Sequence, residues 1–69
     1  MKMSHYFPES FISGIDYKNN KLYVEFNGKN LYAYPNVPLS VYEDFVAATS
    51  KSEFFKEHIK NLPFEKINV

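Results

Sequence analysis

Hydrophobic and polar residues alternate in the first half of the chain, and a period of two is typical of half-buried β-strands. The alternation is clearest in KLYVEF, residues 21–26. An earlier strand is predicted over residues 11–17, FISGIDY, where Gly14 permits a bulge that turns both neighbouring isoleucines to one face. The turn KNNK separates these two strands, and the dipeptide Asn-Gly at 27–28 leads into a third strand over residues 29–34.

The hydrophobic period changes to that of an α-helix after Pro35 and Pro38. A first helix is expected to start near Pro38 or at Ser40, because Ser40 and Glu43 fit a capping box. The apolar side of this helix is formed by Val41, Tyr42, Phe45, Val46 and Thr49. The pattern therefore predicts a helix that covers one face of the sheet.

A second helix is predicted from a second capping box, Ser50 with Glu53. Its apolar stripe contains Phe55, Ile59 and Leu62, and Pro63 is expected to end it. The fold class is then α+β: a three-stranded antiparallel β-meander followed by two α-helices packed on one face. Residues 1–10 predict an irregular N-terminal arm, and residues 11–69 a single domain.

The hairpin at Asn-Gly decides where Tyr32 and Tyr34 point, because a slip of one residue moves every side chain to the other face. A two-residue turn pairs Val24 with Leu31 and places both tyrosines beside Tyr23 on the outer face. A three-residue turn pairs Glu25 with Lys29 and buries Tyr32 and Tyr34. The second register buries more aromatic surface, and we therefore favour it.

Composition limits the classes of function. The chain of 69 residues has seven Phe and six Tyr but no Cys, which excludes disulfides and thiolate metal sites. Net charge is zero and Arg is absent, so a globally basic nucleic-acid-binding surface is excluded as well. No apolar run is long enough to span a membrane, and no signal peptide is evident, so a cytoplasmic location is expected. Neither a cofactor nor a metal is expected.

The ordered set of motifs resembles the KTSC family, a small domain that occurs alone in bacterial and phage proteins and at the C-terminus of some lysyl-tRNA synthetases. The resemblance covers about residues 9–66. Its motifs are Ile12, Ile15 and Tyr17, Val24-Glu25-Phe26, Tyr32 and Tyr34, Val37-Pro38, Val41-Tyr42, Ser50-Lys51, Phe54-Phe55 and His58-Ile59. Ser52 stands where the family pattern has Gly, and Ala33 separates the tyrosines. The association with synthetases implies RNA binding, which is an analogy and not a site argument.

Two sets of residues are candidate RNA-binding sites. In the first, Tyr23, Tyr32 and Tyr34 would stack bases beside Lys21 and Lys29, or the tyrosines are simply core and cover. The second set is Ser50, Lys51 and His58, which form either a phosphate pocket at the helix start or an ordinary capping box with a solvated lysine.

No pair of carboxylates, catalytic triad, metal-ligand set or Gly-rich loop can be assembled from the sequence, so we expect no enzyme. The first hypothesis is a small non-catalytic module that binds tRNA or structured RNA. The alternative is a protein-interaction module, with another protein or a second copy of itself as the partner, because aromatic residues are enriched at protein interfaces.

Overall fold

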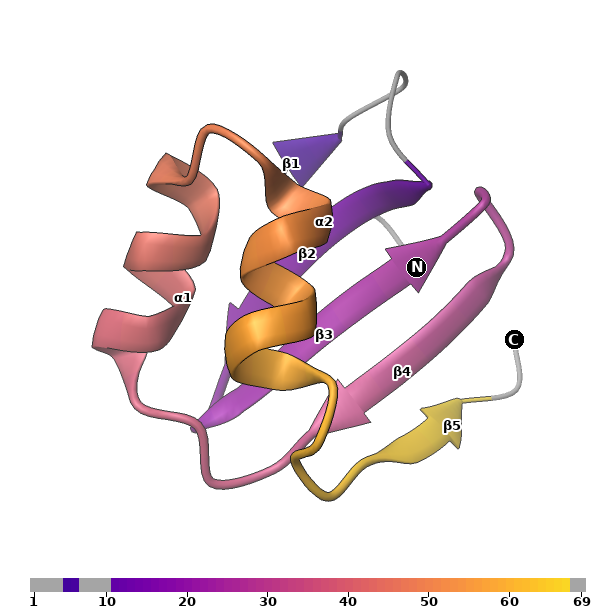
Figure 1. Ribbon diagram of the computed structural model, residues 1–69. Helices are drawn as coiled ribbons and strands as arrows, with labels where there is room; N and C mark the ends of the chain where they lie inside the picture. Colours follow the sequence, from indigo (N-terminus) through magenta and orange to yellow (C-terminus); the bar gives the residue numbers. More distant parts are fainter. Residues whose placement is uncertain (1–4, 7–10, 68–69) are drawn as a thin grey trace.

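The computed structural model describes residues 5–6 and 11–67 as an antiparallel sheet with two helical segments on one face (Figure 1). The strands lie in chain order, β1-β2-β3-β4-β5. Their bounds are β1 His5–Tyr6, β2 Ile12–Lys18, β3 Lys21–Phe26, β4 Asn30–Tyr34 and β5 Glu65–Ile67. The predicted α+β class, antiparallel meander and one-sided pair of helices are confirmed. The predicted number of three strands is too small, because β1 and β5 extend the meander at its edges.

The two additional strands are too short to show a hydrophobic period of their own. Within the predicted irregular arm, His5 and Tyr6 pair with Ile15 and Gly14 of β2. The remaining residues of the arm lie outside the described part of the chain. At the other edge β5 returns after the helices and pairs with the centre of β4.

The predicted bulge is present in β2, where the register shifts between Ile12 and Gly14. This extra residue turns Ile12 and Ile15 to the same face, and both are 0% exposed. The turn between β2 and β3 is made by Asn19 and Asn20, which both have positive φ, as their tolerance of left-handed backbone predicts.

The register of β3 and β4 differs from both predicted registers. Val24 pairs with Tyr32 and Leu22 with Tyr34, across a turn of three residues, 27–29. The pairing is shifted by two residues from the register that we favoured. Because side chains alternate between the two faces, a shift of two residues leaves each residue of β4 on the predicted face. Tyr32 and Tyr34 therefore face the helices, as predicted. The predicted pair of Glu25 with Lys29 is wrong, because Glu25 lies opposite Leu31.

The hairpin turn is fixed by contacts with β2 as well as by its own sequence. The backbone N–H of Asn27 donates to the carbonyl of Phe11 at 2.9 Å, and that of Gly28 donates to Oγ of Ser13 at 2.7 Å. Asn27 and Gly28 both have positive φ, 54° and 73°. Local turn propensity alone could not reveal this anchoring, which explains why the exact pairing was missed.

The first helix, α1 Leu39–Ala47, begins one residue before Ser40. Its N-cap is Pro38, with no side-chain cap bond, so the predicted Ser40–Glu43 capping box is wrong. Ser40 is already inside the first turn and cannot occupy the cap position. Thr49 lies beyond the end of the helix.

The second helical segment consists of α2 Lys51–Phe54 and, directly after it, the π-helical turn η1 Phe55–Ile59. Oγ of Ser50 accepts the N–H of Glu53 at 3.3 Å, so the predicted cap at Ser50 is confirmed. The N–H of Lys60 donates to the carbonyl of Phe55 at 2.8 Å, five residues back, and closes the wide turn. The helix therefore ends before Leu62, and Leu62 is exposed instead of forming part of the predicted stripe.

The core lies between the sheet and the helices. Phe45 of α1 and Ile59 of η1 are both 0% exposed and pack onto the inner face of the sheet. The buried cluster contains Ile12, Ile15, Leu22, Val24, Tyr34, Val37, Phe45 and Ile59. At about 25 cal/mol per Å² of apolar area, burial of these side chains is the main force that stabilises the fold.

Candidate functional site

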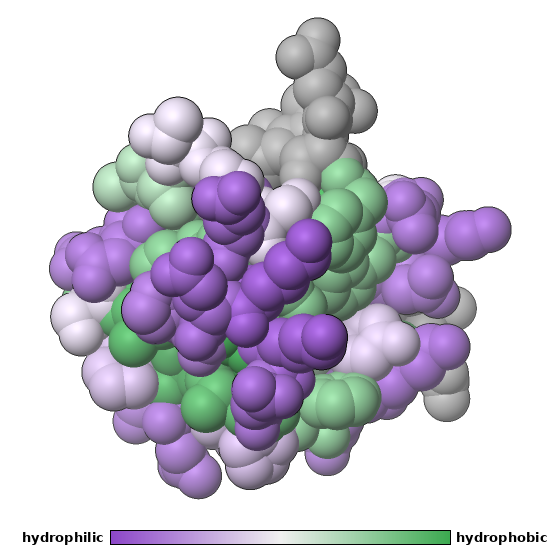
Figure 2. Space-filling view, in the orientation of Figure 1, coloured by the Kyte–Doolittle hydropathy of each residue, from purple (hydrophilic) through white to green (hydrophobic). Residues whose placement is uncertain are grey.

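An open groove of about 390 Å³ lies beside η1, over the ends of β3 and β4 that meet at the hairpin turn. We call it the aromatic groove, and it is lined by Phe11, Phe26, Asn27, Asn30, Tyr32, Tyr34, Phe55, Lys60 and Phe64. Figure 2 shows hydrophobic surface exposed beside the polar outer side of the helices. A large open apolar surface of this kind is typical of binding sites.

The floor of the groove follows from the register of the hairpin. Because Phe26 and Tyr32 point to the helical side of the sheet, their rings meet edge to face, with centroids 5.4 Å apart. Phe55 of η1 adds a ring 5.1 Å from Phe26 and 6.2 Å from Tyr34. Tyr34 is 2% exposed and belongs to the buried core, as the favoured register predicts. Tyr32 is partly buried, packs against this core and lines the groove.

Exposed rings stand at two places on the rim. Phe11 is 44% exposed and stacks on Phe26 with centroids 5.7 Å apart. Phe64 is 54% exposed, and its ring lies 5.1 Å from Tyr32 and 5.7 Å from Tyr34. Each of these rings has one side against the protein and a considerable area in water. Flat apolar groups of a ligand could therefore stack on them.

Three lysines lie in the groove's lining or next to it along the chain or the sheet. Lys60 is the charged residue of its lining. Lys66 lies opposite Tyr32 in the β4–β5 pair and therefore shares its face of the sheet. Lys29 sits in the turn between the lining residues Asn27 and Asn30. A local basic rim thus exists on a protein whose net charge is zero.

The hydroxyl of Tyr34 is kept protonated. Burial, with a smaller contribution from Tyr32, raises the pKa of Tyr34 from 10.0 to about 12. Tyr34 is 2% exposed. The effect of this shift is therefore confined to alkaline pH.

The first predicted site is only partly assembled. Tyr32 and Tyr34 line the aromatic groove, but Tyr23 pairs with Ala33 and lies on the opposite face of the sheet. Lys21 starts β3 and Lys29 follows its end, so the two lysines are separated by the length of the strand. The structure brings Lys29 to the groove and leaves Lys21 and Tyr23 away from it.

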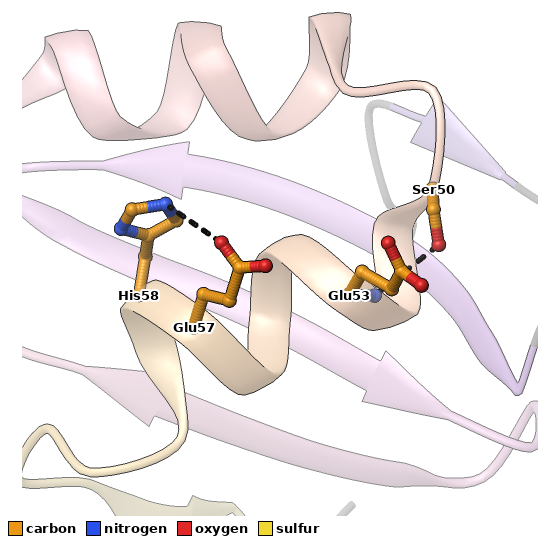
Figure 3. A network of polar contacts seen from close by, with 4 residues as sticks. All are labelled: Ser50, Glu53, Glu57 and His58. Carbon is orange, nitrogen blue, oxygen red and sulfur yellow. Dashed lines mark hydrogen bonds and ion pairs between the residues drawn. The ribbon is translucent and has the colours of Figure 1, made fainter.

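The second predicted site is not assembled as a pocket. Ser50 caps α2, and Nζ of Lys51 donates to the carbonyl of Ala48, which closes the end of α1. His58 projects from η1 on the side of α1, and its Nε2 lies 3.8 Å from Oε2 of Glu57 (Figure 3). These contacts are with neighbouring parts of the chain, and the structure does not bring the three side chains together around one site.

Several lining residues of the aromatic groove were missed by sequence reasoning. Phe11, Phe26 and Phe55 were assigned to strands or to a helical stripe, and nothing local shows that their rings converge. Phe64 gave the one available signal, because a large aromatic residue directly after a helix-ending proline is unlikely to belong to the helix core. The place of Lys60 in the lining could not be predicted, because Lys60 directly follows a π-helical turn that the sequence pattern did not indicate.

The fold and the groove define a small α+β domain with an open aromatic surface and no assembled catalytic group in its lining. A family model, that of the KTSC domain, matches residues 8–64. The chain belongs to the KTSC domain family. No curated protein matches it. Within the part of the chain that the structure describes, no helix is long and apolar enough to cross a membrane.

Proposed function

We propose that the protein is a small non-catalytic module that binds an unpaired stretch of RNA, such as a loop of a tRNA or of another structured RNA, in the aromatic groove. The observation that carries this proposal is the combination of the exposed rings of Phe11 and Phe64 with a basic rim. The lining offers no carboxylate, imidazole or thiol for acid–base or nucleophilic chemistry, which favours binding over catalysis.

Stacking supplies the affinity in this proposal. Bases in single strands stack on aromatic side chains, and each such contact is worth about 1–3 kcal/mol. Phe11 and Phe64 accept one base each on their exposed surfaces. The side-chain amides of Asn27 and Asn30 lie in the same lining and can hydrogen-bond to base edges.

Lysines at the rim contact the phosphates. The cationic residues at the rim are Lys29, Lys60 and Lys66. For single strands, the slope of log K against log salt concentration is about −0.7 for each phosphate neutralised, so three lysines give a slope of about −2. Binding is therefore weak at physiological salt and strongest at low salt.

Fluorescence anisotropy with labelled single-stranded RNA and with tRNA, at low salt, tests the proposal. Phe64→Ala should weaken binding by about 1–3 kcal/mol. Leu39→Ala is the matched control, because Leu39 is also exposed, at 51%, and does not line the groove. Lys60→Gln should weaken binding, whereas Lys21→Gln should not.

The absence of any anisotropy change at high micromolar protein would refute RNA binding. Equal losses in the Phe64 and Leu39 variants would show that the groove is not the site.

Protein recognition is the second candidate function, and the net charge of zero favours it. Aromatic residues are enriched at protein interfaces, so Phe11 and Phe64 are suited to that role as well. Sedimentation at high protein concentration distinguishes the two. If the wild type self-associates and Phe64→Ala is monomeric, while neither binds RNA, then the groove serves a protein partner.

A further inference from the structure

A second cleft, of about 430 Å³, lies where the loop between β4 and α1 meets α1 and the end of η1. It shares no lining residue with the aromatic groove. Figure 2 shows strongly hydrophobic surface low between the two helical segments, in this region of the molecule. The volume lies within the range of about 300–1,000 Å³ that is typical of small-molecule sites. We call it the proline cleft, because Pro35, Pro38 and Pro63 line it.

The walls of the proline cleft are largely apolar. Val37, which is 2% exposed, and Val41 form one side, and Phe54 and Leu62 form the other. Leu62 is available for this wall because the π-turn ends the helix at Ile59. A ligand with a hydrophobic body would therefore lose water-exposed apolar area on entering.

Hydrogen-bond donors are scarce in the lining. Three prolines have no backbone N–H. The N–H groups of Val37, Val41 and Leu62 already donate within the protein, to Asn20, Pro38 and Ile59 respectively, at 2.9–3.0 Å. The donors left in the lining are the backbone N–H and side-chain amide of Asn36 and the ring of His58. Such a lining selects against anions, which need several donors.

The charge at the mouth is negative. The carboxylate of Asp44 belongs to the lining, and no hydrogen bond or ion pair of Asp44 occurs within residues 5–6 and 11–67. Glu57 brings a second carboxylate to His58, at 3.8 Å (Figure 3). No lysine lines the cleft. Apolar walls, few donors and an available carboxylate are complementary to one ligand chemistry, a cation on an apolar body.

We propose that the proline cleft binds a small organic ammonium compound, with its hydrocarbon part between Val41 and Leu62 and its ammonium group on the carboxylate of Asp44. The volume favours a free small molecule over a single lysine side chain of a partner, which would fill only a small part of it. This inference does not depend on RNA binding, because the two sites share no residue.

An NMR titration of the ¹⁵N-labelled protein with three probes that share a phenylethyl group tests the proposal. The probes are 2-phenylethylamine, 2-phenylethanol and 3-phenylpropionate, which are cationic, neutral and anionic at neutral pH. The amine should shift the amide resonances of Val41, Asp44 and His58 saturably, with a dissociation constant in the millimolar range. The alcohol should bind more weakly, and the carboxylate should cause no saturable shift. Equal binding of all three probes, or no saturable shift with the amine, would overturn the proposal.

Charge-removing variants locate the ammonium group. Asp44→Asn keeps the shape of the side chain and should weaken amine binding roughly 1.5- to fivefold, the range for a solvent-exposed ion pair. Glu43→Gln is the matched control, since Glu43 is an exposed neighbour on α1 that does not line the cleft. His58→Lys places a permanent positive charge at the mouth and should also weaken the amine. If Asp44→Asn and Glu43→Gln bind the amine as tightly as the wild type does, the carboxylate has no part in binding and the proposal is wrong.

Discussion

Alkaline pH should destabilise the native protein through the hydroxyl of Tyr34, and Tyr34→Phe should remove this effect. In the folded state burial raises the pKa of Tyr34 from 10.0 to about 12. Below pH 10 the hydroxyl is protonated in both the folded and the unfolded chain, so this group adds no pH dependence. Above pH 10 the unfolded chain ionises first, and the folded state loses stability relative to it.

The size of the effect follows from the two pKa values. Each pH unit between 10.0 and about 12 lowers the free energy of unfolding by about 1.4 kcal/mol, and the total loss is about 2–3 kcal/mol. Above about pH 12 both states are ionised and the loss stops growing. A domain of this size has a net stability of only about 3–5 kcal/mol, so the loss is a large share of it.

Urea unfolding followed by circular dichroism, at pH values from below 10 to about 12, measures the effect. Every other titratable group is common to the wild type and Tyr34→Phe. The difference between the two proteins isolates the hydroxyl of Tyr34 and should grow with pH. Parallel curves for the two proteins would refute the argument, as would ultraviolet absorbance that shows all six tyrosines ionising together near pH 10.

Four further variants test the packing and the caps. Ser50→Ala should lower the free energy of unfolding by about 1 kcal/mol, because it removes the cap on α2. Ser40→Ala should change the free energy of unfolding by less than about 0.5 kcal/mol, because Ser40 is not a cap. Equal effects of the two variants in urea unfolding would contradict this assignment of the caps. Ser13→Ala should lower the free energy of unfolding by about 1 kcal/mol, because the N–H of Gly28 loses its acceptor. Amide hydrogen exchange at Gly28 should become faster. Unchanged exchange would contradict the role of Ser13 in holding the hairpin turn. Ile59→Ala should cost about 2–5 kcal/mol and leave a large unfolded fraction by circular dichroism, and a fully folded variant would show that η1 contributes little to the core.

The hydrophobic pattern was sufficient for the class of the fold and for the inward face of β2, β3 and β4, although it misplaced Leu62. Ile12 and Ile15 were placed together because a bulge at Gly14 was needed to bury both, and the register shift is found there. The exact pairing of β3 with β4 could not be obtained in this way. It depends on the N–H groups of the turn donating to β2, and such contacts are tertiary and have no local signal.

The candidate site was less accessible to sequence reasoning than the fold. Tyr32 and Tyr34 were correctly turned toward the helices, but they were treated as one pair, whereas Tyr34 is buried in the core and Tyr32 keeps part of its surface in the groove. Phe64 belongs to the groove because η1 ends early through a π-turn, which no residue pattern predicts. Lys29, Lys60 and Lys66 come from three separate segments, and their relation to the groove follows only from its lining and the strand pairing.

The short outer strands have a consequence for how the protein behaves at high concentration. Of the seven residues of β2, two pair with β1, and three of the five residues of β4 pair with β5. Within residues 5–6 and 11–67, the edge strands β1 and β5 offer an incoming chain two and three residues to pair with. Aggregation through sheet edges usually starts from a long exposed edge strand, and edge strands as short as these make it less favourable.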